Sequence, residues 1–162
     1  MMMENNKESN KNKRKRIYPV RLQKEHLSEV AEIEKVCFSS PWSMNSLELL
    51  LPNRGIGIGA VALSDGKVCA YGGMLCVLDE GQITNIATLP EMRNMGYGTA
   101  VTEQLIRFAK EERLVTVTLE VRESNATAIS MYKRLGFEVV GKRKDFYTKP
   151  VESALIMCHK IK

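Results

Sequence analysis

Apolar and polar residues recur with two different periods along the chain, and each period predicts one kind of element. Alternation over a few residues, or a short apolar run between turn residues, is typical of a strand, whereas apolar residues three and four positions apart indicate a helix. Seven strands are predicted on this basis: Ile17–Leu22, Ile56–Leu63, Val68–Leu78, Gln82–Thr88, Val115–Arg122, Phe137–Tyr147 and Glu152–Lys160.

Helical spacing predicts four helices between these strands. They are His26–Phe38, a short helix from Ser43 to Leu51, Thr99–Glu112, and a helix from Asn125 to Leu135. Ser43 and Asn125 can cap their helices because their side chains accept hydrogen bonds from free amides of the first turn. Gly136 can end the last helix in a left-handed conformation. The order of elements favours an α/β (α+β) fold, with a mixed central sheet of about seven strands and about four flanking helices.

A glycine turn, Arg93-Asn94-Met95-Gly96-Tyr97-Gly98-Thr99, lies between a predicted strand and a predicted helix. The amides of a first helical turn have no acceptor within the helix and lie at the positive end of its dipole. Such a turn can bind phosphate or pyrophosphate, although it can also be a plain helix start. No Lys-Ser/Thr pair follows Gly98, which argues against a site for ATP and magnesium.

A second glycine cluster, Gly55–Gly59, leads into a predicted strand and the hairpin turn Ser64–Lys67. A dinucleotide-binding fingerprint would follow a strand and open a helix. We therefore interpret this cluster as structural.

Charge separates a short tail from the rest of the chain. Residues 1–16 hold six Lys and Arg against two Glu and no apolar run, and the other 146 residues carry a net charge of only +1. We expect 1–16 to be a disordered basic tail, in weak contact with RNA at most, and 17–162 to be one domain. Nowhere are there eighteen consecutive apolar residues or the apolar segment of a signal peptide, so we expect a soluble cytoplasmic protein without a membrane partner.

The four cysteines are scattered, and no C-x-x-C pair or His at ligand spacing accompanies them. They are Cys37, Cys69, Cys76 and Cys158. This pattern indicates reduced thiols used as small apolar residues, and no metal site is expected.

Two polar residues stand out beyond the glycine turn. Glu120 interrupts a strand whose other face is apolar, and the alternative to a chemical role is an ion pair with Arg122 on the same face. Tyr132 follows Asn125 by seven residues, close to two helical turns, so both project from nearly one helix face. Core packing is the alternative for Tyr132.

Four segments together resemble the GNAT superfamily of N-acetyltransferases. They are Gln82–Thr88, Arg93-x-x-Gly96-x-Gly98, the segment from Leu119 through Asn125 to Ala128, and Tyr132-x-x-Leu135-Gly136-Phe137. Ser40-Pro41-Trp42-Ser43 and Phe146-Tyr147 resemble the bacterial ribosomal-protein-alanine N-acetyltransferases within it. The resemblance covers about residues 17–160.

The resemblance implies that acetyl-CoA is the acetyl donor. Its pyrophosphate would lie on the amides of the glycine turn, Arg93 to Thr99, and its pantetheine chain between Ile86-Ala87-Thr88 and the strand at Thr118–Val121. An amide near Ile86 would stabilise the oxyanion, and Asn125 would contact the cofactor.

The resemblance also implies that Glu120 is the general base and Tyr132 the general acid. Trp42 and Tyr147 are candidates for the peptide groove, with simple packing as the alternative. The family commonly has two adjacent tyrosines where this chain has Phe146-Tyr147, so any hydroxyl contact from the first is lost here.

The implied acceptor is the N-terminal alanine of a small-subunit ribosomal protein. An α-amine, with a pKa of about 7.7–8.0, is partly neutral at pH 7, whereas a Lys side chain with a pKa of about 10.4 is not. A lone carboxylate is therefore a sufficient base for an N-terminal substrate. The alternatives are a small amine or Lys side chain as acceptor, or a non-catalytic module that binds acetyl-CoA or RNA.

Overall fold

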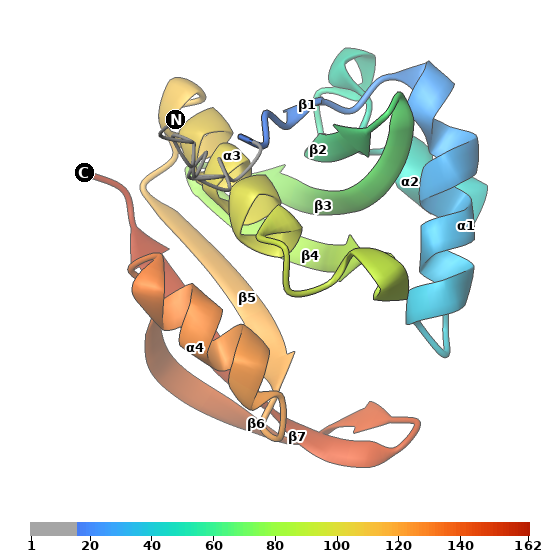
Figure 1. The fold of residues 1–162 in the computed structure, drawn as a ribbon. Coiled ribbons are helices and arrows are strands. Elements are labelled where there is room, and N and C mark those ends of the chain that lie inside the picture. The colour runs from blue at the N-terminus through green and yellow to red at the C-terminus, as the bar shows by residue number, and fades with distance from the viewer. Residues whose placement is uncertain (1–15) are drawn as a thin grey trace, which may run out of the picture.

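A seven-stranded sheet runs through the molecule in the order β1-β2-β3-β4-β5-β7-β6 (Figure 1). This computed structural model describes residues 16–162, so the predicted tail, apart from Arg16, lies outside the described residues. The strands are β1 (Val20–Arg21), β2 (Gly57–Ser64), β3 (Lys67–Val77), β4 (Glu80–Thr88), β5 (Thr116–Arg122), β6 (Glu138–Thr148) and β7 (Val151–Lys160). Strands β4 and β5 are parallel, and the other neighbouring pairs are antiparallel. The predicted mixed sheet is confirmed.

Four α-helices and three short 3-10 helices accompany the sheet. They are α1 (Leu27–Cys37), α2 (Met44–Glu48), α3 (Tyr97–Glu111), α4 (Ala126–Arg134), η1 (Lys24–His26), η2 (Pro52–Arg54) and η3 (Pro90–Met92). Both predicted caps are present: Ser43 Oγ accepts from the amide of Ser46 and Asn125 Oδ1 from that of Ala128, each at 3.2 Å. Gly136 follows α4 with a φ of 90°.

Two elements are shorter than predicted. Strand β1 pairs with β2 over two residues only, and Pro19 directly before it has no N–H to donate to a longer ladder. Helix α2 ends at Glu48 rather than Leu51, and 3-10 bonds close its end, such as that from the amide of Leu50 to the carbonyl of Leu47.

The sheet has an apolar cluster on each face. One cluster packs under α1 and α2: Leu22, Leu27, Val30, Ile33, Leu47, Leu50, Leu51, Val61, Val68, Tyr71 and Ala87. The other packs under α3 and α4 and includes Val101, Leu105, Phe108, Val117, Leu119, Val121, Phe137 and Met157. Alternation in β5 sends its apolar residues to the second cluster and leaves Glu120 on the opposite face.

Strands β4 and β5 separate half-way along their length (Figure 1). Their described pairs run from Glu80↔Thr116 to Ile83↔Leu119 and stop there, although β4 continues to Thr88. A bulge places Thr84 as an extra residue in β4, and bulges bend a strand. Residues 84–88 therefore line an opening between a β1–β4 half and a β5–β7 half of the sheet.

The Gly55–Gly59 cluster has the structural role predicted for it. Gly57 and Gly59 lie in β2, where an added Cβ would come within 2.7 Å of Leu49 O and Leu22 Cβ respectively. Close packing of the backbone therefore explains these two glycines.

No helix in the described part of the chain is long and apolar enough to cross a bilayer.

Candidate active site

A cleft of about 1010 Å³ occupies the opening between the two halves of the sheet. Its walls come from six segments: the loop between α1 and α2, the end of β4, the glycine turn, the end of β5, helix α4, and the turn of the β6–β7 hairpin. All but one of the expected site residues line it: Trp42, Ile86, Ala87, Thr88, Arg93, Asn94, Gly96, Tyr97, Gly98, Thr99, Glu120, Asn125, Tyr132 and Tyr147. Met95 is the exception; its side chain is 59% exposed.

The glycine turn presents free amides to the cleft. Asn94 and Gly96 have positive φ angles of 62° and 91°, and the first helical hydrogen bond runs from the amide of Ala100 to Gly96 O at 3.0 Å. Within the part of the chain that the structure describes, the amides of residues 94–99 have no protein acceptor. Together with the N-terminus of α3, they form a site suited to an anion.

The Arg93 side chain anchors this turn to β4. Its Nε donates to Thr88 O at 3.2 Å, and its Nη2 lies 3.7 Å from Cys37 Sγ. The Cys37 thiol donates to the same carbonyl at 3.4 Å. The amide of Arg93, which the sequence placed among the free amides of the turn, instead donates to Pro90 O at 3.4 Å. Both its amide and its guanidinium are therefore engaged within the protein, and the free amides begin at Asn94.

Gly98 leaves room that the protein itself does not require. An added Cβ would lie 3.7 Å from both Thr88 Oγ1 and Met131 Sδ, which is ordinary van der Waals contact. The missing side chain instead allows a ligand to approach the backbone closely.

Glu120 lies on the wall formed by β5 and is 14% exposed. Gln82 Nε2 donates to its Oε2 at 3.3 Å, and Arg143 Nε lies 3.7 Å from its Oε1. The alternative prediction from the sequence, an ion pair between Glu120 and Arg122, is wrong. Arg122 turns toward the β6–β7 hairpin and pairs with Glu152 at 3.3 Å.

Arg122 fixes the hairpin wall of the cleft. It donates to Pro150 O at 3.0 Å and Lys149 O at 3.2 Å, and its guanidinium lies 4.2 Å from the ring centre of Tyr147. Ser39 Oγ donates to Lys149 O at 3.5 Å from the opposite wall. The α1–α2 loop and the hairpin turn thus meet over the cleft, with Trp42 on one wall and Tyr147 on the other.

Tyr132 is 7% exposed and packs edge-to-face on Phe137, with ring centres 5.6 Å apart. Burial, with a smaller contribution from Tyr147, raises the pKa of Tyr132 to about 12. No hydrogen bond from its hydroxyl to another described residue is present, and Tyr132 is among the residues that line the cleft. The ring packs in the core, as expected if Tyr132 served packing alone. The raised pKa also keeps its hydroxyl protonated near neutral pH, as a proton donor must be.

The thiols of Cys69 and Cys37 differ in burial and in their position relative to the cleft. Cys69 is buried, and burial raises the pKa of its thiol; Cys37 is half-buried and lines the cleft. No group of three or more potential metal ligands occurs within residues 16–162.

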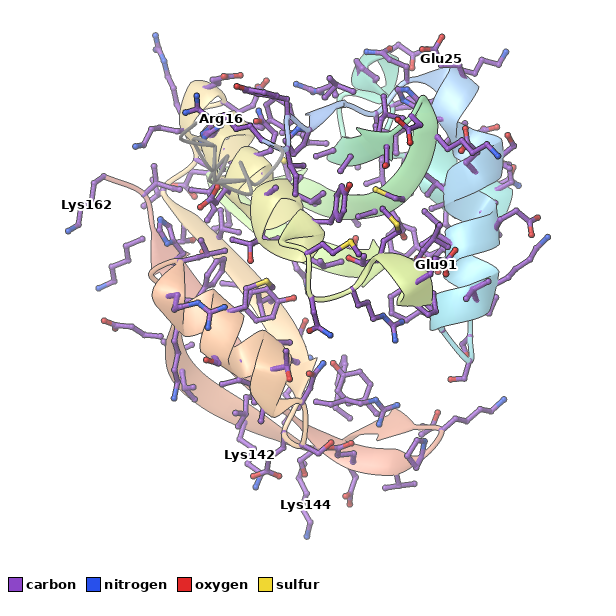
Figure 2. All side chains as sticks on the ribbon, viewed as in Figure 1. Arg16, Glu25, Glu91, Lys142, Lys144 and Lys162 are labelled. Carbon is purple, nitrogen blue, oxygen red and sulfur yellow. The ribbon has the colours of Figure 1, made fainter. Side chains whose placement is uncertain are left out.

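The two halves of the molecule carry opposite charge. Residues 17–115 contain nine Lys and Arg against twelve Asp and Glu, whereas residues 116–162 contain nine against five. Figure 2 shows Glu25 and Glu91 on the half that carries α1, and Lys142, Lys144 and Lys162 on the half that carries β5–β7. The cleft lies at the boundary between these halves.

The profile of the acetyltransferase (GNAT) family matches residues 27–137, more than half of the chain. The chain belongs to the GNAT family. This GNAT protein is 38% identical over 133 residues to a Bacillus subtilis protein whose provisional name is ribosomal protein bS18-alanine N-acetyltransferase. The match covers 82% of this chain and 88% of the relative. It is 35% identical over 127 residues to the ribosomal protein bS18-alanine N-acetyltransferase of Escherichia coli, covering 77% and 84%. The predicted family is confirmed.

Solved structures agree with this assignment. The crystal structure of the Escherichia coli ribosomal-protein-S18-alanine N-acetyltransferase matches this GNAT protein with a TM-score of 0.80 and 32% identity, covering 91% of this chain and 95% of that one. The Arabidopsis thaliana NAA60 structure, in complex with a bisubstrate analogue, has a TM-score of 0.80 at 17% identity, a likeness in fold alone. The GNAT fold and the acetyltransferase class are therefore established for this chain.

Three residues at or beside the cleft had no clear signal in the sequence. Gln82 and Arg143 contact Glu120 from different strands, and Asn85 lines the cleft from β4 with 8% of its surface exposed. The break in alternation that the Thr84 bulge creates hides the direction of Asn85. Its position within the family-like segment Gln82–Thr88 was the only available pointer.

Proposed function

We propose that this GNAT protein transfers the acetyl group of acetyl-CoA to the α-amine of a protein N-terminus, namely the N-terminal alanine of a small-subunit ribosomal protein. The names of the Bacillus subtilis and Escherichia coli relatives support the acceptor. The single observation that carries the chemistry is the convergence of Glu120 and a protonated Tyr132 on the cleft where β4 leaves β5.

The residues present fit acetyl-CoA. The free amides of residues 94–99 suit its pyrophosphate, and the space at Gly98 admits it close to the backbone. The unpaired edge of β4 from Thr84 to Thr88 offers backbone groups to an extended pantetheine chain, as an added strand would be bound. Asn125 uses its Oδ1 to cap α4, so its Nδ2 is the group left for a ligand.

Bound acetyl-CoA supplies the thioester that reacts. The neutral α-amine attacks the thioester carbonyl, an N–C bond forms, and an amide near Ile86 stabilises the oxygen as charge develops. Glu120 accepts the proton released from the amine, directly or through water. The C–S bond then breaks, and Tyr132 donates its hydroxyl proton to the thiolate. No enzyme cysteine need bond to the acetyl group.

The geometry favours an α-amine over a Lys side chain. The proposed base is a single carboxylate. A Lys side chain, with a pKa of about 10.4, is almost fully protonated at pH 7, and one carboxylate removes that proton poorly. The roof made by Ser39 and Lys149 also narrows the entry to the cleft. A flexible chain terminus can pass beneath it more easily than a Lys on a folded surface.

A peptide library tests the proposal. Peptides that differ in their first residue and contain internal Lys are incubated with acetyl-CoA, and mass spectrometry locates the acetyl group. We expect α-acetylation, strongest for N-terminal alanine. Full acetylation of peptides whose α-amines have been blocked would contradict the proposal, and identify Lys or another amine as the acceptor.

We further propose that residues 17–162 contain all of the chemistry and work in the cytoplasm, and that the basic tail takes no part. Deleting residues 1–16 should leave kcat/KM for a free peptide unchanged. A collapse of peptide acetylation in the shortened protein would show that the tail belongs to the catalytic unit.

A further inference from the structure

One fully buried carboxylate has no part in the proposed chemistry. Glu34, on α1, has 0% of its surface exposed. A carboxylate is costly to bury unless hydrogen-bond donors surround it. Glu34 has three: the amide of Trp42 at 2.8 Å, Asn85 Nδ2 at 2.6 Å, and the hydroxyl of Tyr71. Burial and the negative charge of Glu34 raise the pKa of Tyr71, which keeps that hydroxyl a donor.

Two of these donors belong to the cleft. Trp42, from the α1–α2 loop, and Asn85, from β4, both line it, whereas Tyr71 is fully buried in β3 and lines no part of it. The two carboxylate oxygens of Glu34 contact different elements. Oε2 accepts from the amide of the loop, and Oε1 accepts from the side chains on the two strands. The carboxylate therefore joins the loop wall of the cleft to the strand that carries Ile86.

The charge of Glu34 also dictates how Asn85 is oriented. A carboxylate only accepts hydrogen bonds, so the NH₂ group of Asn85 must face it. The Oδ1 atom of Asn85 then has no partner among the described residues. A neutral side chain at position 34 would remove the reason for this orientation, because an amide can face Asn85 with either of its ends.

We propose that Glu34 is a positioning residue for the acceptor: its carboxylate holds the Trp42 segment and Asn85 in place, so that the acceptor side of the cleft is formed before the peptide binds. This inference rests on the proposed function for the nature of the acceptor. A preformed wall lowers the conformational entropy lost on binding. Loss of the tether should therefore weaken peptide binding while leaving the glycine turn unaffected.

A matched pair of variants tests the tether. Glu34→Gln keeps the volume and removes the charge, whereas Tyr71→Phe removes one donor to the same carboxylate without changing the cleft lining. Both should lower the midpoint of thermal unfolding. We expect Glu34→Gln to raise the peptide KM about tenfold, the effect of one charge-assisted hydrogen bond, with acetyl-CoA affinity within about twofold of wild type. Tyr71→Phe should change the peptide KM by less than about twofold.

Trp42 supplies a direct probe because it is the single tryptophan of the chain. In Glu34→Gln its emission should shift to longer wavelength as the loop loosens, and in Tyr71→Phe it should not. An unchanged peptide KM in Glu34→Gln, or an equal rise in both variants, would overturn the proposal and reduce Glu34 to a stabiliser of the fold.

Hydrogen exchange of the wild-type protein tests the tether without any variant. The amide of Trp42 should exchange much more slowly than that of Ser43, for which no acceptor lies among the described residues. Equal exchange rates would overturn the tether. A wild-type protein that acetylates only Lys or small amines would refute the proposed function alone, and the KM for that amine would then test Glu34.

Discussion

Glu120 sits in the cleft with weak partners. The Gln82 amide at 3.3 Å and the Arg143 guanidinium at 3.7 Å leave part of its lone-pair capacity free to receive a proton. Arg143 is itself 56% exposed, so water screens its charge. This environment suits a base that must accept a proton and release it again to solvent.

Glu120→Gln should lower kcat/KM for an α-amine peptide roughly 100-fold, the typical contribution of a general base. The loss should be greatest at low pH, since hydroxide can replace the missing base as pH rises. Acetyl-CoA affinity should stay unchanged, because the glycine turn is untouched. Kinetics from pH 6 to 9 with a binding measurement would check this, and wild-type turnover across that range would remove Glu120 as the base.

Tyr132→Phe should slow transfer at least tenfold with the fold intact, because the ring still packs on Phe137. Since the pKa of Tyr132 is raised to about 12, the wild-type enzyme should keep its proton donor, and hence its kcat, up to pH 10. A wild-type rate for Tyr132→Phe would limit Tyr132 to packing. A kcat that falls between pH 8 and 9 would contradict the raised pKa.

Single residues differ in how far the sequence could predict them. The motif segments bring Glu120, Asn125 and Tyr132 to the cleft as predicted, while their roles stay predictions. The partners of Glu120 could not be predicted, because Gln82 and Arg143 come from strands whose register only the folded sheet sets. Met95 lies outside the cleft lining because the turn points its side chain to solvent.

Gly96, directly before α3, and Gly98, in its first turn, should respond differently to an added methyl group. Gly98→Ala places a Cβ in open contact distance of Thr88 and Met131, so stability should change little while acetyl-CoA affinity falls. Gly96→Ala imposes a φ of 91° on an L-residue, and should cost about 1 kcal/mol of stability. Thermal unfolding and calorimetric titration with acetyl-CoA would separate the two effects. Unchanged acetyl-CoA affinity in Gly98→Ala would place the ligand elsewhere.

Elements were predictable where the signal was local. Ser43 and Asn125 mark the starts of α2 and α4 because capping depends on the nearest few residues. The Thr84 bulge was not predictable, because it depends on how β3 and β4 pair. The burial of Glu34 was hidden for a similar reason: α1 carries several Glu residues, and only tertiary packing decides which one turns inward.

For the molecule as a whole, stability should depend on alkaline pH through its buried tyrosines. The pKa values of Tyr71 and Tyr132 are raised in the folded state, chiefly by burial. Unfolded tyrosines release their protons near pH 10 while the folded ones keep them, so the free energy of unfolding should be constant below about pH 10 and fall above it.

Urea denaturation at intervals from pH 8 to pH 11 would measure this decline. Tyr132→Phe should flatten part of it, because one of the phenols with a raised pKa is gone. A wild-type profile that stays level to pH 11 would contradict the raised pKa values.

The early separation of β4 from β5 has a mechanical consequence. Among residues 16–162, strand pairing joins the two halves of the sheet only from Glu80↔Thr116 to Ile83↔Leu119. An extended ligand laid along the edge of β4 would therefore add contacts between the two strands where they are not paired. A ligand at a concentration of about 100 times its Kd adds about 2.7 kcal/mol to the stability of the form it binds. Acetyl-CoA would then also stabilise the junction between the two halves of the sheet while it is bound, and the release of CoA would remove that stabilisation.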